Sequence, residues 1–212
     1  MLSFFLVFEI IGTIAFAVSG AVKGIKYKMD LFGVCVLGLV TGVGGGVIRD
    51  SIIGNTPVVA IKNPLFAIVA IVASLVTFSA LYLIDKKSVF DNKIYELFMF
   101  IADTLGLAVF TNTAIAIART IGINSVFPLI FLGVLTGVGG GVLRDVFCGD
   151  VPYIFKKHIY ALASAAGALI NIVIYEFFPN KFAATGGILT VIILRFLAAY
   201  FKWNLPKINY FE

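Results

Sequence analysis

Acidic side chains inside long apolar runs are the first residues of this sequence that could do chemistry. Glu9 and Asp103 each lie in such a run. An ionisable residue inside a membrane-spanning helix costs at least ~2.5 kcal/mol on insertion scales, so it is a functional-site candidate by default. The alternative is that each acid is an interfacial residue near the start of its helix. Small, aromatic and hydroxyl residues follow each acid and would form a stripe along a polar pathway. These candidate pathway residues are Thr13, Phe16 and Ser19 after Glu9, and Phe110, Thr111 and Thr113 after Asp103.

Two glycine runs are the second feature, and each is followed by an Arg-Asp pair. A glycine costs about 1 kcal/mol relative to alanine inside a helix, so each run predicts a kink or a break. Irregular backbone at membrane depth is tolerated only where protein buries it or water reaches it. We therefore expect two broken helices that expose backbone groups to a polar pathway. The alternative is that the glycines allow close helix packing. The runs are Gly42, Gly44, Gly45 and Gly46, and Gly137, Gly139, Gly140 and Gly141.

The arginine after each glycine run needs a neutralising partner. Glu9 and Arg49 fall near one face of the membrane, whereas Asp103 and Arg144 fall near the other. The sequence thus predicts two ion pairs, Glu9 with Arg49 and Asp103 with Arg144, one near each mouth of a pathway. The acid directly after each arginine is the alternative partner. These two acids are Asp50 and Asp145.

Composition and motifs argue against several classes of protein. Hydrophobic residues make up 61% and charged residues 13% of the chain, against roughly 25% charged residues in a globular domain. The net charge of +5 does not indicate nucleic-acid binding, because the lysines cluster in short segments between apolar runs. Cys35 and Cys148 lack the spacing of metal ligands, and Val47 replaces the third glycine of a dinucleotide fingerprint. We expect no catalytic residues, no metal and no cofactor.

Seven apolar segments approach the ~20 residues that a membrane-spanning helix needs. The chain is therefore expected to be an all-α integral membrane protein with short polar connections. The segments are residues 3–22, 31–48, 64–84, 97–118, 126–143, 159–178 and 182–201.

Basic residues on alternate sides of these segments predict the orientation. Eleven fall on one side, including the loop residues Lys23, Lys26, Lys86 and Lys87, and four fall on the other. This places the C-terminus in the cytoplasm and the N-terminus outside, in a multi-pass protein of the cell membrane. Arg195 lies near the inner end of the last segment, where its side chain could snorkel to the headgroups.

An internal repeat organises the chain. Thr41-Gly-Val-Gly-Gly-Gly-Val-Ile-Arg-Asp50 returns 95 residues later as Thr136-Gly-Val-Gly-Gly-Gly-Val-Leu-Arg-Asp145, and Pro57 returns as Pro152. Each unit holds three segments, an odd number, so the second unit must enter the membrane upside down. Such inverted repeats are typical of transporters and channels. The expected units are 1–93, the inverted 94–179, and 180–212 with the seventh helix and a cytoplasmic tail.

The doubled glycine-arginine-aspartate motif with its prolines resembles the prokaryotic homologues of the trimeric intracellular cation channels, the TRIC family. The resemblance spans nearly the whole chain. It implies a homotrimer with a water-filled, potassium-permeable pore in each protomer, lined by the first, second, fourth and fifth helices. The family's helix kinks would fall at Gly44 to Gly46 and Gly139 to Gly141. The lysine-containing motif of the animal channels is absent here, so their regulation does not carry over.

The expected function is a monovalent cation channel in the lipid bilayer, with potassium foremost. The same sequence domain is also labelled a glycine transporter, and a secondary transporter for glycine or another small amino acid is the alternative. A transporter needs a discrete midplane site for carboxylate and amine, whereas a channel needs a continuous polar path. The sequence offers hydroxyls, glycine backbone and charged mouths, which favours the channel.

Overall fold

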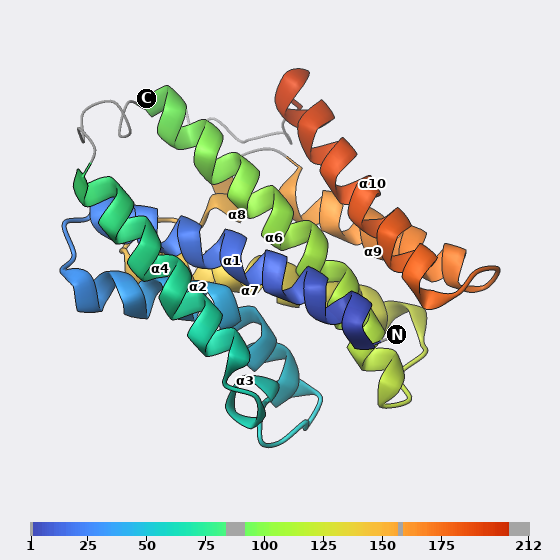
Figure 1. Cartoon of the computed structure of the whole chain (residues 1–212). Helices are drawn as coiled ribbons and strands as arrows, with labels where there is room; N and C mark the ends of the chain where they lie inside the picture. Colours follow the sequence, from blue (N-terminus) through green and yellow to red (C-terminus); the bar gives the residue numbers. More distant parts are fainter. Residues whose placement is uncertain (1, 84–91, 157–158, 204–212) are drawn as a thin grey trace.

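The computed structural model describes residues 2–83, 92–156 and 159–203, and the regular structure in these ranges is helical (Figure 1). Lys86, Lys87 and the other positions outside these ranges lie beyond the described residues. The helices, in chain order, are α1 (Leu2–Lys26), α2 (Leu31–Ile52), α3 (Val59–Lys62), α4 (Leu65–Leu83), α6 (Asn92–Thr120), α7 (Val126–Phe147), α8 (Tyr153–Lys156), α9 (Tyr160–Tyr175) and α10 (Asn180–Tyr200).

A helix stands at each of the seven predicted spans. Six of them are long and apolar enough to cross a bilayer, namely α1, α2, α4, α6, α7 and α10. The seventh candidate, α9, has 16 residues and falls short of the ~20 that a span needs. The prediction of an all-helical, multi-pass membrane protein is confirmed in this coarser form, and the count of seven spans stays a prediction.

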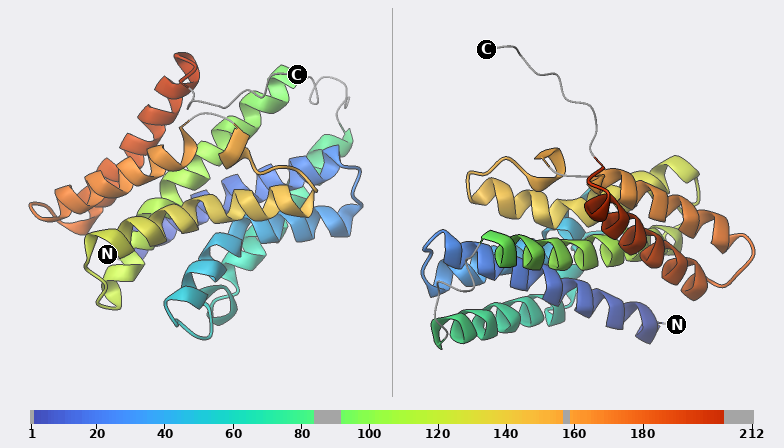
Figure 2. Two further views of the ribbon diagram at one scale, coloured as in Figure 1. Left: turned by 180° about the vertical axis from the view of Figure 1, so that it is seen from behind. Right: turned by 90° about the horizontal axis from the view of Figure 1, so that it is seen from above.

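The centre of the molecule is formed by α1, α2, α6 and α7 (Figures 1 and 2). Within this group α1 packs on α2 and α6, and α7 packs on α2 and α6. On one flank α4 covers α1 and α2, while α9 and α10 pack together and cover α6 and α7 on the other. Of the six candidate spans, α6 is the most buried. Residues from both halves of the sequence therefore meet in the core.

The backbone after each glycine run has the same local geometry in both halves. The Asp50 carboxylate accepts a hydrogen bond of 2.8 Å from the Val59 amide at the start of α3. The Asp145 carboxylate likewise accepts one of 2.8 Å from the Tyr153 amide at the start of α8. A negative charge is stabilised at a helix N-terminus by the free amide groups there. Each aspartate is thus held in place by the short helix that follows it.

The predicted helix breaks at the glycine runs are wrong, because α2 and α7 are continuous helices through both runs. A Cβ atom on Gly45 would lie 2.3 Å from the Thr136 carbonyl oxygen, and one on Gly140 would lie 2.2 Å from the Thr41 carbonyl oxygen. The two backbones therefore touch where these glycines lie. Close packing offsets the low helix propensity of glycine.

Candidate ion pathway

The Arg144 side chain on α7 forms the most connected site in the core, which we call the second-repeat site (Asp103, Arg144, Asp145). Both terminal nitrogens of Arg144 donate to the Asp103 carboxylate on α6, with Nη2 lying 3.0 Å from Oδ2. Arg144 Nε donates to Asp145 Oδ1 at 2.9 Å, and Nη1 also donates to the Ser19 hydroxyl on α1 at 2.9 Å. The three charged side chains are almost fully buried. The ion pair expected from the depths of Asp103 and Arg144 is therefore present, and so is the alternative pair.

Lys23, which the sequence alone places among the loop charges, completes the second-repeat site. Lys23 Nζ, at the end of α1, lies 2.7 Å from both Asp145 Oδ1 and Asp150 Oδ2. Lys23 follows Ser19 by one helical turn, so it extends the polar stripe of α1. That spacing is the signal that could have identified it.

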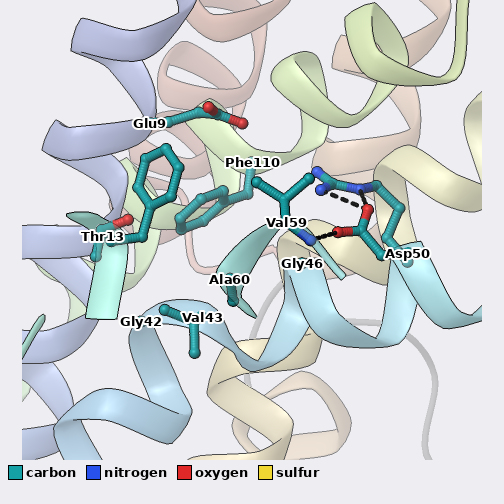
Figure 3. A pocket seen from close by; sticks show the side chains of 11 residues that line it. Glu9, Thr13, Gly42, Val43, Gly46, Asp50, Val59, Ala60 and Phe110 are labelled. Carbon is teal, nitrogen blue, oxygen red and sulfur yellow. Dashed lines mark hydrogen bonds and ion pairs between the residues drawn. The ribbon is translucent and has the colours of Figure 1, made fainter. Parts of the chain in front are cut away.

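The equivalent first-repeat site (Glu9, Arg49, Asp50) has a different arrangement. Arg49 binds Asp50 through Nε at 2.9 Å and Nη2 at 2.8 Å. Among the described contacts, Glu9 and Arg49 form no ion pair within 4.0 Å, so the expected Glu9–Arg49 pair is not observed. Glu9 on α1 and Asp50 on α2 instead line one cavity from different helices (Figure 3). The acid and the arginine are separated here but joined at the second-repeat site.

The cavity at the first-repeat site has a volume of about 40 Å³. This is room for ~3 water molecules. Thr13, Gly42, Gly46 and Phe110 line it together with the charged residues (Figure 3). The matching position at the second-repeat site, beside Gly141, has no room for water. A larger cavity of about 260 Å³ lies beyond the Arg144 ion pairs, lined by residues that include Lys23, Lys26 and Tyr95.

Two aromatic rings pack together where α1 meets α6. Phe16 on α1 and Phe110 on α6 have ring centroids 5.5 Å apart. Each ring packs on a glycine of the opposite helix, Phe16 on Gly106 and Phe110 on Gly12. Phe16 is buried, while Phe110 also contacts the cavity of the first-repeat site. The rings form an apolar barrier between α1 and α6.

The predicted hydroxyl stripe divides between cavity and packing roles. Thr13 lines the first cavity, whereas the Thr111 hydroxyl is bonded to Ser164 of α9 at 2.7 Å and so fixes helix packing. Thr113 contacts a separate cleft of about 560 Å³ that also reaches Glu9. Its buried hydroxyl has no hydrogen-bond partner among the described residues.

The expectation that Arg195 snorkels to the headgroups is wrong. Its side chain on α10 is fully buried, and its guanidinium lies 4.7 Å from the ring centroids of both Phe100 and Tyr160. Arg195 Nε reaches the Thr104 hydroxyl at 3.4 Å. Aromatic faces attract a cation, and this attraction is stronger away from water. The Arg195 guanidinium is therefore stabilised by aromatic side chains in the protein core and not by lipid headgroups.

Comparison with known proteins identifies the family. A family model described as Glycine transporter matches residues 6–82 and 100–176. The inner membrane protein YadS of Escherichia coli (strain K12) is 36% identical over 207 residues, 93% of each chain. The membrane protein YvgT of Bacillus subtilis (strain 168) is 33% identical over 201 residues, 94% of each chain.

Solved structures resemble the whole chain as well. One, from work on the structural basis for conductance through TRIC cation channels, has 35% identity and a TM-score of 0.83, covering 97% of this chain and 98% of its own. The TRIC orthologue from Rhodobacter sphaeroides has 28% identity and a TM-score of 0.84, covering 94% and 98%. The chain belongs to the prokaryotic TRIC family.

The two segments of this TRIC protein that match the family model each contain one copy of the site. Residues 6–82 hold Glu9, Arg49 and Asp50, and residues 100–176 hold Asp103, Arg144 and Asp145. These six residues could be predicted from sequence because they recur. Lys23 and Asp150 have no charged counterpart in the other copy, and Arg195 on α10 lies outside both matched segments, so neither the Lys23–Asp150 contact nor the buried role of Arg195 was predicted.

Proposed function

We propose that this TRIC protein is a cation channel whose pathway runs within one protomer, between α1, α2, α6 and α7. The path would lead from the first-repeat cavity, past Phe16 and Phe110, to the larger cavity at the second-repeat site. The observation that carries the proposal is a pair of buried arginine–carboxylate sites, each beside a cavity, in one four-helix core. The solved structures that resemble this chain are described as TRIC cation channels, which supports the same conclusion.

The charges of the two sites favour cations over anions. At the first-repeat site the Glu9 and Asp50 carboxylates face one guanidinium, that of Arg49. At the second-repeat site three carboxylates surround Arg144 and Lys23. Each site therefore carries one more negative than positive group when all are ionised. A surplus of carboxylates at a mouth raises the local concentration of cations.

The described conformation corresponds to a closed channel in this proposal. The Arg144–Asp103 pair fills the space beside Gly141, and the two phenylalanine rings separate the cavities. Opening requires the Arg144 side chain to separate from Asp103. The equivalent residues Arg49 and Glu9 are already separated in the described conformation. We infer potassium as the main permeant ion, because hydroxyl oxygens such as that of Thr13 can replace the water around a weakly hydrated cation.

We further propose that the protein assembles as a homotrimer with one pathway in each protomer. The family relationship supports this assembly. The exposed apolar side chains do not distinguish a trimer from a monomer, because in a membrane protein such side chains contact lipid as readily as another protomer. Crosslinking in mild detergent should give a trimer band. Monomers and dimers alone would contradict this assembly while leaving the pathway within one protomer intact.

A transporter for glycine is the second candidate, because the matching family model carries that description. A zwitterion could place its carboxylate at Arg49 and its ammonium at Glu9, which line the same cavity. Arg49 already binds the Asp50 carboxylate through Nε and Nη2, however, so a substrate carboxylate would have to displace it. The geometry therefore favours the channel.

Recording from purified protein in planar lipid bilayers, beside uptake of radiolabelled glycine into vesicles from the same preparation, separates the two functions. The channel proposal predicts unitary currents in potassium chloride and no saturable glycine uptake. Saturable uptake without unitary currents would favour the transporter instead.

A further inference from the structure

The ammonium of Lys23 occupies a position between two carboxylates at the mouth of the larger cavity. Its Nζ atom lies 2.7 Å from Asp145 Oδ1 and 2.7 Å from Asp150 Oδ2. The Lys23 side chain is 7% exposed, whereas that of Asp150 is 37% exposed. Tyr27 also donates to Asp150, and this hydrogen bond raises the pKa of Tyr27 to about 12. Lys23 thus lies inside the site, while Asp150 faces the cavity.

The opposite end of the core, at the first-repeat site, lacks both members of this pair. Ile117 stands at the position equivalent to Lys23, and Asn55 stands at the position equivalent to Asp150. The backbone is nevertheless the same, because the Asn55 amide donates to the Asp50 carbonyl at 2.9 Å and the Asp150 amide donates to the Asp145 carbonyl at 2.9 Å. The fold therefore forms without the charged pair at one end. The pair has a role specific to the second-repeat site.

The two carboxylate oxygens around Lys23 Nζ lie within the span that one divalent cation could bridge. The Asp145 and Asp150 oxygens lie 2.7 Å from one nitrogen, so they are separated by no more than twice that distance. Oxygens on opposite sides of Ca²⁺, at 2.3–2.6 Å each, are ~5 Å apart. The adjoining cavity of about 260 Å³ has space for water ligands. Without the ammonium, two carboxylates and water would suit a divalent cation.

We propose that Lys23 is a built-in counter-ion that keeps divalent cations off the Asp145 and Asp150 carboxylates. The ammonium bonds both acids, while Arg144 Nε and the Tyr153 amide also bond Asp145. A divalent ion would therefore have to displace a competitor that is tethered to the chain. Monovalent cations bind two carboxylates weakly and pass. The consequence for conduction rests on the proposed channel function, whereas the exclusion of divalent ions from this site does not.

The test is calcium binding to purified protein, measured as the rise in unfolding temperature with calcium chloride concentration. Lys23→Met should bind Ca²⁺ roughly tenfold or more tightly than wild type, because a positive charge a few ångströms from the site is removed. Lys26→Met is the matched control. Lys26 is on the same helix and lines the same cavity, but its ammonium lies over the Tyr95 ring, 3.6 Å from the centroid.

A double variant separates binding at the acids from a general loss of stability. Lys23→Ile combined with Asp150→Asn copies Ile117 and Asn55, the equivalent residues at the opposite end of the core, so it should fold and show no calcium-dependent rise. Lys23→Gln replaces Lys23→Met if the latter cannot be purified, with the same expected gain in affinity.

Equal calcium dependence in wild type, Lys26→Met and the Lys23 variants would overturn the inference. Because this measurement needs no current, it tests the inference even if the protein does not conduct. In bilayers, calcium on the Lys23 side should block Lys23→Met and leave Lys26→Met unaffected. Currents that calcium does not block in Lys23→Met, despite tight binding, would limit the inference to binding.

Discussion

Glu9 and Asp103 occupy equivalent positions but have different partners. Asp103 accepts two hydrogen bonds from Arg144, while Glu9 stands across a cavity from Arg49. Charge-assisted bonds of the bidentate kind are strong and geometrically specific. The second-repeat site is therefore held together by its charges, and the first-repeat site leaves its acid available to a cation.

Asp103→Asn should lower the free energy of unfolding by about 3 kcal/mol, the lower end of the range for breaking a buried pair, because Asp145 and Ser19 still bind Arg144. Glu9→Gln, the matched change, should alter stability by less than about 0.5 kcal/mol, because Glu9 forms no ion pair with any other described residue. It should instead reduce cation current. Chemical unfolding in detergent measures the first effect and bilayer recording the second. Equal destabilisation by both variants would contradict the difference between the two sites.

Sequence spacing predicted the charged residues that recur in both repeats and missed the roles of those that do not recur. Depth in the membrane placed Asp103 beside Arg144, but it could not show that the shared cavity keeps Glu9 away from Arg49. Lys23 was assigned to a loop because the apolar segment ends at residue 22. The helix α1 continues beyond that segment to Lys26. Arg195 was assigned to the membrane surface because it lies near the end of the last apolar segment. Its aromatic neighbours, Phe100 and Tyr160, come from other helices, so local sequence could not indicate its burial.

At the scale of elements, the glycine runs allow α2 and α7 to come into backbone contact. Gly45 and Gly140 lie against the carbonyl groups of the opposite helix. A Cβ on Gly46 or Gly141 would instead meet no atom closer than 3.8 Å or 3.6 Å, respectively. Neighbouring glycines in one run thus serve different purposes. The packing role belongs to one face of each helix and the cavity role to another.

Gly45→Ala should destabilise the protein by about 1–3 kcal/mol, as overpacking does, because its Cβ would meet a backbone oxygen. Gly46→Ala is the control, since the nearest atom to its Cβ would be Arg49 Nη2 at 3.8 Å. The control should be neutral or stabilising by up to about 1 kcal/mol, because alanine favours the helix. Thermal unfolding of both variants in one detergent gives the comparison. Equal stability of the two variants would show that helix contact at Gly45 is not as described.

Hydropathy located the long helices well but gave their ends and the glycine runs poorly. The segment predicted as 31–48 is a helix over Leu31–Ile52, because the Arg49–Asp50 pair is buried by protein and need not leave the membrane core. A glycine run can mean either a break or a contact. The neighbouring helix decides between them, and local sequence does not describe that neighbour.

At the scale of the whole molecule, the two ends of the core are unequal. One end has a small open cavity at Glu9, while the other is closed by the Arg144 network with a larger cavity beyond it. A repeat predicts two similar ends. The differences arise from residues such as Lys23 and Asp150 that only one copy carries.

The predicted orientation can be tested with described residues on opposite faces. In a variant without Cys35 and Cys148, Lys26→Cys should react with a membrane-impermeant thiol reagent only after the cells are opened. Thr120→Cys should react in intact cells. The physical basis is the excess of basic residues on the cytoplasmic side. Labelling of Lys26→Cys in intact cells would show that the orientation is the opposite of the predicted one. The proposed pathway would be unaffected by that result.

The reversal potential of single channels in a potassium chloride gradient shows directly whether the protein conducts cations or anions. The surplus carboxylates at both sites predict a reversal potential near the potassium equilibrium potential. Glu9→Gln should move that potential toward the chloride value, because it removes the surplus at one mouth. A wild-type reversal potential near the chloride equilibrium potential would contradict the cation channel proposed here.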